Sequence, residues 1–380
     1  MSSREALRRA AVLACAVLLV RLFAPWFCGL EGDAWYRGDP RVQRALADDL
    51  IAFEFRDDVE RTATTNRFAG EWALVTHQMI ALGLAQLCLE HSEWRGAYAP
   101  QVTKAARKSF LPEMRGFGTR AWYGEDALAS LQGGHGHAYL AYSALAIGMA
   151  RLVDPAFPAE AAASHDALIA AYERRLLASS TGLIETYPNE AYPTDVAAVA
   201  AAIAVHGRAT GVDHHRVLQH WVSRVRAVQI DPASGLVFQR MGAIRGEPHD
   251  APRGSGTGLA AYYAGFVDRA LAESLAKGLF AHESTFFGFG AIREYAAGHR
   301  GGGDIDSGPV ILGVSVAATG FSLAPARALG RRDSFERIYR TTALFGLPVG
   351  HGDRSRFATG GPIGNALLLA FLTSGSEVPR

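Results

Sequence analysis

Six apolar stretches rich in small residues recur along this chain, and this repetition most constrains how it can fold. Their starting points lie roughly fifty to sixty-five residues apart, about the length of one helical hairpin. The stretches are Ala69–His91, Gly134–Val153, Ala191–Thr210, Ser255–Ala270, Asp306–Leu329 and Gly361–Thr373. Apolar helices repeated in this way are buried by packing against one another. The pattern therefore predicts a closed ring of hairpins with a cavity at its centre.

More polar helical stretches alternate with the apolar ones, and each spaces its apolar residues as a helix exposed on one face does. They are Arg41–Phe55, Ala99–Phe110, Pro158–Ala178, Asp213–Val228, Asp268–Phe280 and Arg331–Phe345. Two layers of six helices predict an all-α (α/α)6 barrel. An open superhelical solenoid is the alternative, because sequence periodicity alone does not show closure. The short strand signals, Leu236–Met241 joined to Ala243–Arg245 as a hairpin, and Thr285–Phe289, are expected to lie in loops.

Length and composition place residues 31–380 in a single barrel domain, since 380 residues that are 49% hydrophobic can bury a large core. The net charge of +1 gives nucleic-acid binding no electrostatic support. A small apolar molecule is the expected partner, and a homo-oligomer is possible. The three cysteines, Cys15, Cys28 and Cys88, form neither a disulfide framework nor a zinc-binding pattern, and no cofactor or metal is expected.

Residues 1–30 differ from the rest of the chain. Three arginines within the first nine residues precede the apolar run Ala10–Val20, and Arg21 separates it from Leu22–Leu30. The two runs together approach the length that spans a bilayer, and the basic start favours an N-in anchor with an extracytoplasmic domain. A cleaved signal segment, which would make the protein secreted, is one alternative. A buried N-terminal helix is another.

Acidic and aromatic residues gather where the first apolar stretch begins. Glu71 and Trp72 are expected to line the cavity, although an acid in the first turn of a helix is also favoured by the helix dipole. Asp57 belongs to an acidic cluster upstream, which in most proteins is a solvated face. The entrance of the second stretch holds Tyr123 and, among three glycines, His135 and His137. The two-residue spacing of the histidines disfavours a shared metal, so His137 is a candidate acid or base.

The third entrance holds Tyr187, Glu190, Tyr192 and Asp195 around two prolines. A carboxylic acid partly buried among aromatic rings has a raised pKa and can donate a proton. A simple helix cap is the structural alternative at this entrance. The remaining entrances are rich in glycine, match no nucleotide-binding pattern and offer Asp304 and Asp306 as cavity acids.

At these residues the chain resembles the linalool dehydratase/isomerase family, from about Asp57 to Leu372. The similarity is best at Gly136-His137 and the following Leu140 and Tyr142, which resemble the family's Gly-His with its catalytic histidine. The other similar segments are Phe68 to Trp72, Tyr187 to Glu190, Gly303 to Gly308 and Gly364 to Ala370. The resemblance implies an (α/α)6 barrel that hydrates, dehydrates and isomerises a monoterpene alcohol without a cofactor.

One aligned position and one departure from the family pattern bear on the reaction. Alignment on Trp72 puts Asp57 where the family has a catalytic aspartate. The family's two active-site cysteines fall here near Thr186 and on Asp195, so that no cysteine remains in the cavity. Asp195 is then the natural substitute for a lost thiol.

Three functions follow from these observations. The leading hypothesis is a lyase or isomerase of the hydro-lyase type acting on an apolar, isoprenoid-like alcohol or alkene. His137 and Asp195 would be its acid/base pair, with Asp57 and Glu190 as alternates. The first alternative is a glycoside hydrolase or polysaccharide lyase on the same barrel. The second is a membrane-tethered binding protein without catalytic activity.

Overall fold

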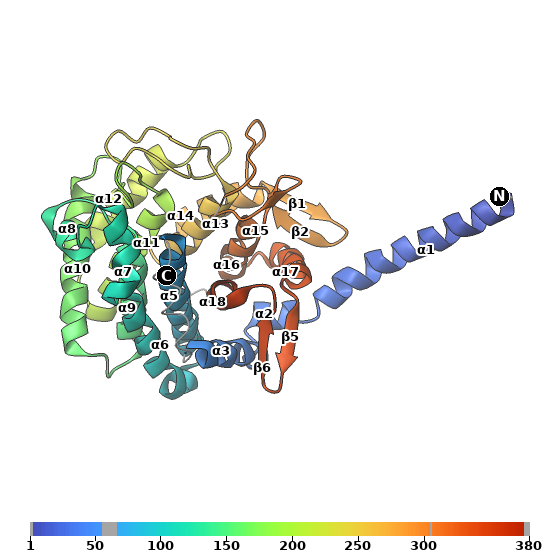
Figure 1. Ribbon diagram of the computed structural model, residues 1–380, viewed down its shortest axis with the longest axis horizontal. Helices are drawn as coiled ribbons and strands as arrows, with labels where there is room; N and C mark the ends of the chain where they lie inside the picture. Colours follow the sequence, from blue (N-terminus) through green and yellow to red (C-terminus); the bar gives the residue numbers. More distant parts are fainter. Residues whose placement is uncertain (1–2, 55–66, 305, 376–380) are drawn as a thin grey trace.

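The computed structural model describes residues 3–54, 67–304 and 306–375 of the chain (Figure 1). Its inner helices follow the six apolar stretches. They are α5 (Arg67–Glu90), α9 (Leu140–Val153), α11 (Pro193–Thr210), α13 (Gly254–Ala264), α15 (Val316–Phe321) with α16 (Leu323–Ala328), and α18 (Gly361–Leu372). Each inner helix contacts the next, and α18 returns to contact α5. The ring therefore closes, which the sequence pattern alone could not distinguish from an open solenoid.

The outer helices follow the more polar stretches. They are α3 (Pro40–Glu54), α6 (Arg95–Ser109), α10 (Ala159–Ala178), α12 (His215–Arg224), α14 (Arg269–Phe280) and α17 (Arg332–Gly346). Shorter helical segments are α2 (Gly32–Arg37), η1 (Ser92–Trp94), α7 (Pro112–Ala121), α8 (Ala127–Gly133) and the π-helical η2 (Val225–Gln229). The protein is thus mostly helical, as predicted, and its two alternating layers resemble an (α/α)6 toroid.

The inner helices are built from small residues because several backbones must meet around one axis. In α11, every residue from Val196 to Ile203 is buried. Gly83 of α5 marks the closest approach at the closure of the ring, since a Cβ there would lie 2.6 Å from Leu369 Cγ and 3.1 Å from the backbone nitrogen of Ala370. Such distances leave no space for a side chain on this face of α5.

Gln86 links three inner helices at the opposite end of the ring from the third entrance. Its side-chain nitrogen donates to the carbonyl oxygen of Ala370 at 2.7 Å and to Thr373 Oγ1 at 2.9 Å, and its side-chain oxygen accepts from the Tyr262 hydroxyl at 2.8 Å. All these groups are buried, so each hydrogen bond is made away from competing water. This network ties α5 to α13 and to the end of α18.

The strand predictions need correction. Residues 236–245 form no hairpin, because Met241 pairs through isolated bridges with Ala191 and Pro248 instead. Three two-stranded antiparallel sheets lie elsewhere. They are β1 (Glu283–Phe286) with β2 (Phe289–Ile292), β3 (Val310–Ile311) with β4 (Val314–Ser315), and β5 (Pro348–His351) with β6 (Arg354–Phe357). The predicted strand Thr285–Phe289 falls on the turn of the first sheet.

Two inner helices also begin later than predicted. The stretch Gly134–Val153 becomes helical only at Leu140, because Gly134, Gly136 and His137 all have positive φ and cannot continue a right-handed helix. The stretch Asp306–Leu329 starts with the β3–β4 hairpin, which delays the helix to Val316.

The N-terminal helix α1 (Ser3–Cys28) projects away from the ring (Figure 1). Its described large apolar side chains are exposed, and Leu7 reaches 75%. Within the described part of the chain, the helix long and apolar enough to cross a membrane is Gly70–Glu90, which is mostly buried within the ring as part of α5. Several side chains of α1 lie outside the described residues.

Replacement of Gly83 tests how closely the ring closes. We expect Gly83→Ala to lower the free energy of unfolding by about 1–3 kcal/mol, because the added methyl group overpacks the contact between α5 and α18. Gly364→Ala is the matched control, since a Cβ at this α18 position meets nothing within 4 Å. Urea unfolding of both variants measures the difference. Equal effects of the two substitutions would contradict the close approach at Gly83.

Candidate functional site

Asp195 lies in the first turn of α11 and accepts two hydrogen bonds from hydroxyl groups. Tyr142 of α9 donates to Oδ1, and Thr186, in the loop before α11, donates to Oδ2 at 2.6 Å. Tyr142 and Thr186 are both buried, whereas Asp195 is only partly covered. The carboxyl group is therefore held by two neutral donors from two different segments and keeps access to the surface.

Burial raises the pKa of Asp195 to about 6. The hydrogen bonds from Thr186 and Tyr142 stabilise the carboxylate and act in the opposite direction, while the negative charge of Asp306 adds to the rise. Within the described part of the chain, no cationic side chain pairs with Asp195. A carboxyl group with this pKa is populated in both protonation states near neutral pH and can serve as a proton donor.

Further polar groups surround the ring axis near Asp195. The ring of Tyr142 lies 6.0 Å from that of Tyr263 on α13, and the Tyr263 hydroxyl accepts a hydrogen bond from Gln78 of α5 at 3.1 Å. Two turns earlier on α5, Glu71 accepts from the Tyr187 hydroxyl at 3.0 Å. Helices α5, α9, α11 and α13 thus all contribute polar side chains to one end of the ring.

Glu190 and Tyr192 form a second acidic group beside Asp195. The Tyr192 hydroxyl donates to Glu190 at 3.1 Å, and Arg240 forms an ion pair with the same carboxylate at 3.3 Å. The rings of Tyr187 and Tyr192 meet edge to face with centroids 6.4 Å apart. The third entrance predicted from the sequence is therefore one connected polar and aromatic cluster.

Asp304 and Asp306, at the entrance of the fifth apolar stretch, have different environments. Asp306 reaches the surface and accepts from Gln239 at 3.2 Å, and its pKa is raised by desolvation and by the charge of Asp304. Asp304 forms an ion pair with Arg253 and accepts backbone hydrogen bonds in its own turn. Burial works against ionisation of Asp304, but these hydrogen bonds leave its pKa lowered. The negative charge of Asp306 therefore acts on Asp195. Asp304 instead fixes the conformation of its loop through its ion pair and its backbone hydrogen bonds.

Within the described part of the chain, no hydrogen bond joins His137 to Asp195. His137 is fully buried with φ at 68°, and its ring lies between Trp122 at 4.6 Å and Tyr139 at 5.7 Å. Burial lowers its pKa to about 4, and within the described part of the chain neither ring nitrogen has a hydrogen-bond partner. The charged side chains that shift the pKa of His137 do not include Asp195. His137 is thus a neutral, enclosed ring.

The other predicted residues lie as follows. Trp72 is 43% exposed at the start of α5, and Tyr123 is 90% exposed with positive φ. Asp57 lies outside the described residues. Tyr142, Thr186 and Gln239 contact the predicted acids but were not singled out as site residues on sequence grounds. Tyr142 lies within an apolar run, and only its phenol group distinguishes it from the core residues around it.

One cluster of metal-ligand type lies away from the ring axis. Ligand atoms of His165, Asp166 and His206 lie within 4.8 Å of one another. The guanidinium group of Arg151 already donates to both His165 and Asp166, so a cation occupies the position that a metal ion would take. The cluster joins α9, α10 and α11 on the outer side of the ring.

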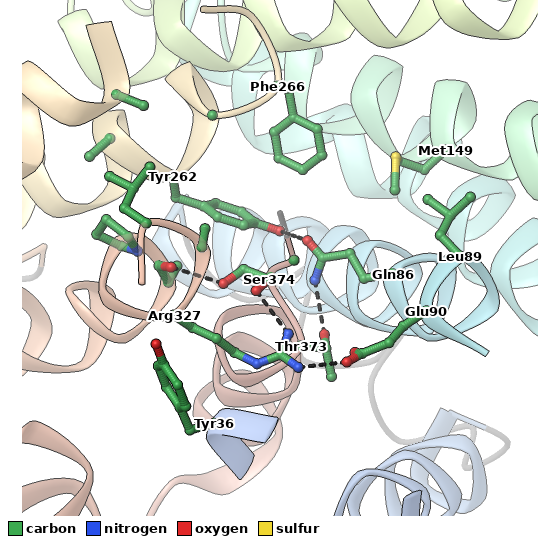
Figure 2. Close-up of a pocket in the computed structure, with 18 of the residues that line it drawn as sticks. Tyr36, Gln86, Leu89, Glu90, Met149, Tyr262, Phe266, Arg327, Thr373 and Ser374 are labelled. Carbon is green, nitrogen blue, oxygen red and sulfur yellow. Dashed lines mark hydrogen bonds and ion pairs between the residues drawn. The ribbon is translucent and has the colours of Figure 1, made fainter. Parts of the chain in front are cut away.

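A cavity of about 310 Å³ lies at the far end of the ring, where the inner helices end (Figure 2). Gln86, Tyr262 and Thr373 line it together with the ion pair between Arg327 and Glu90 at 2.7 Å. The apolar side chains of Leu89, Met149 and Phe266 line its other side (Figure 2). None of the residues predicted to bind substrate lies in this cavity.

Comparisons with known proteins bear on the fold alone. No protein-family model and no curated protein matches the chain, so the resemblance to linalool dehydratase/isomerase has no match at family level. An alpha-1,6-mannanase of Salegentibacter sp. HEL1_6, solved as an inactive variant with alpha-1,6-mannotetrose, has 14% identity over 89% of this chain and 98% of its own, with a TM-score of 0.49.

A glycoside hydrolase of family 105 from C. acetobutylicum ATCC 824 has 15% identity over 79% of this chain and 99% of its own, with a TM-score of 0.36. Neither likeness is close enough to carry an argument. The closed ring therefore rests on the contacts between this chain's own helices.

The pKa of Asp195 predicts a pH-dependent stability. Because the folded-state pKa is raised above the ordinary value of 3.8, the stability that Asp195 contributes is complete below that pH and is lost as pH rises through about 6. We expect the stability of Asp195→Asn relative to wild type to increase by up to about 3 kcal/mol between pH 4 and pH 8.

Urea unfolding of both proteins at several pH values measures this change. Glu160→Gln, at an exposed position in the first turn of α10, is the control and should show no such trend. A constant difference between Asp195→Asn and wild type would show that the pKa is not raised.

Proposed function

We propose that the protein is a cofactor-independent acid/base enzyme in which Asp195 donates a proton to its substrate. The observation that carries this proposal is the partly covered carboxyl group of Asp195, held by Tyr142 and Thr186 with a pKa of about 6. Such a group can protonate a leaving oxygen at neutral pH, a step typically worth roughly 10²–10⁴-fold in rate.

We propose hydrolysis of a glycosidic bond as the reaction. This chemistry needs a protonated carboxylic acid and a second carboxylate to act as base or nucleophile. Asp306 is the proposed second group, because its charge raises the pKa of Asp195 and its side chain is accessible. Glu71, Glu190 and Gln239 supply acceptors and donors for sugar hydroxyl groups, and Trp72 and Tyr192 supply aromatic faces.

A second candidate is the lyase or isomerase on an isoprenoid-like alcohol. The aromatic rings of Tyr142, Tyr187 and Tyr263 around the ring axis favour it, since such faces stabilise a developing allylic cation. In this reaction Asp195 would protonate the leaving hydroxyl group. The enclosed position of His137 leaves Glu71 or Glu190 as the base.

Activity assays on two substrate panels separate these candidates. We expect release of reducing sugar from alpha- or beta-linked oligosaccharides and no turnover of acyclic monoterpene alcohols. Asp195→Asn should lower turnover by roughly 10²–10⁴-fold, whereas Glu160→Gln should not change it. Turnover of the alcohols alone would favour the lyase, and turnover that survives Asp195→Asn would contradict both assignments. Inactivity on both panels would support a binding protein.

The pH dependence tests the role of Asp195 as a general acid. Because the protonated form must react, we expect kcat/KM to fall as pH rises above about 6. An aryl glycoside with a nitrophenolate leaving group needs no protonation, so its cleavage should lose this dependence and should be much less sensitive to Asp195→Asn. If both substrates lose activity equally in the variant, Asp195 is not the proton donor.

We further propose that α1 anchors the protein in a membrane. The apolar run of the N-terminal segment, its arginine-rich start and the exposure of its described apolar side chains support an N-in anchor with the ring outside the cytoplasm. Residues 10–28 would measure about 28 Å as a helix, close to the thickness of a bilayer core.

A further inference from the structure

Two phenylalanines form the tip of the β1–β2 hairpin. Phe286 is 70% exposed and Phe287 is 41% exposed, with their rings 4.0 Å apart. The turn residues Phe287 and Gly288 have φ values of 50° and 83°. Two-residue turns of this kind are normally occupied by Asn-Gly or Asp-Gly, because a large side chain at positive φ is strained. The hairpin thus presents an aromatic pair to solvent at a conformational cost.

The other hairpins give a contrast within the same chain. The β5–β6 turn consists of Gly352 and Asp353, which is the polar composition expected of a solvated tip. The β3–β4 turn holds Leu312, which is 94% exposed, but the following Gly313 lies beside Arg293 beyond the end of β2. The aromatic tip is therefore specific to the hairpin that contacts α1.

Contacts place the tip against the C-terminal half of α1. The Arg21 guanidinium lies 5.1 Å from the centre of the Phe287 ring. A Cβ at Gly288 would lie 3.2 Å from Pro25 Cβ, and Arg340 donates to the carbonyl oxygen of Gly288 at 3.0 Å. The hairpin tip is therefore level with residues 21–25 of α1.

The same part of α1 carries its own aromatic group. Phe23, Trp26 and Phe27 are each about 60% exposed. The Phe23 ring lies 5.4 Å from that of Trp26 and 5.8 Å from that of Phe27. Aromatic side chains at one end of a spanning helix are typical of the membrane interface. The aromatic tip of the hairpin adds to this group from a segment distant in sequence.

We infer that the β1–β2 tip inserts into the outer half of the bilayer beside α1. This inference rests on the proposed membrane anchor. The seven helical steps from Arg21 to Cys28 rise about 10 Å, which is the depth at which the tip would lie. There the Phe287 ring faces the Arg21 charge and offsets part of its cost in the apolar run. The ring domain is then held to the membrane at two points.

Spin labels on single cysteines in the full chain test this arrangement. Cys15 and Cys28 are replaced by serine, and the buried Cys88 is left in place. Labels are attached at Phe286→Cys, at Val17→Cys in the middle of α1, and at Asp353→Cys and Leu312→Cys as exposed controls. The protein is reconstituted into vesicles of neutral and anionic phospholipid. Collision with oxygen, which enters lipid, is compared with collision with a water-soluble nickel complex.

We expect the labels at positions 17 and 286 to collide mainly with oxygen, and those at 312 and 353 with nickel. A label at 286 that collides with nickel while the label at 17 collides with oxygen would overturn the inference and keep the anchor. Nickel collisions at both positions would overturn the anchor itself. Oxygen preference at all four positions would overturn the claim that insertion is specific to the β1–β2 tip.

Discussion

The contact between α5 and α18 is the constraint on which the rest of the structure depends. It joins the first inner helix to the last, and Gly83 permits it because the Leu369 side chain and the backbone nitrogen of Ala370 lie close to where a side chain would stand. Once the ring is closed, Gln78 and Gln86 of α5 reach Tyr263 and Tyr262 of α13. In the first pair the amide donates to the phenol and in the second the phenol donates to the amide, and these buried hydrogen bonds hold the ring at two levels along its axis.

Closure also explains why the chemistry gathers at one end. All inner helices run in the same sense, so their first turns meet, and Glu71, Tyr142 and Asp195 come together from segments far apart in sequence. Within the described residues, Asp195 has no cationic partner at this end of the ring. The neutral hydroxyl groups of Tyr142 and Thr186 bind its carboxylate instead. The carboxyl group consequently keeps a raised pKa, which an arginine in the same position would abolish.

The helical repeat could be predicted from the sequence because apolar periodicity is a local property that each helix expresses by itself. The entrance at Asp195 could be predicted from the sequence as well, since acids and aromatic residues are clustered there along the chain. The hydrogen bond between Asp195 and Tyr142 could not be predicted, because it depends on how α9 and α11 pack. His137 could not be placed either, because its backbone has positive φ and lies before the helix that its glycines introduce. Gln78 and Gln86 were the overlooked signal, because they are polar residues within a long and mostly apolar helix.

The bonds at Asp195 connect its protonation state to the packing of two hairpins. As a carboxylate it accepts from Tyr142 on α9 and from Thr186 at the entry to α11. When it is protonated, one of its oxygens becomes a hydroxyl group and a weaker acceptor, so one of these links loosens. A proton given to a substrate would then be accompanied by tightening between α9 and α11. Turnover would in this way change the rigidity of the ring wall with each cycle.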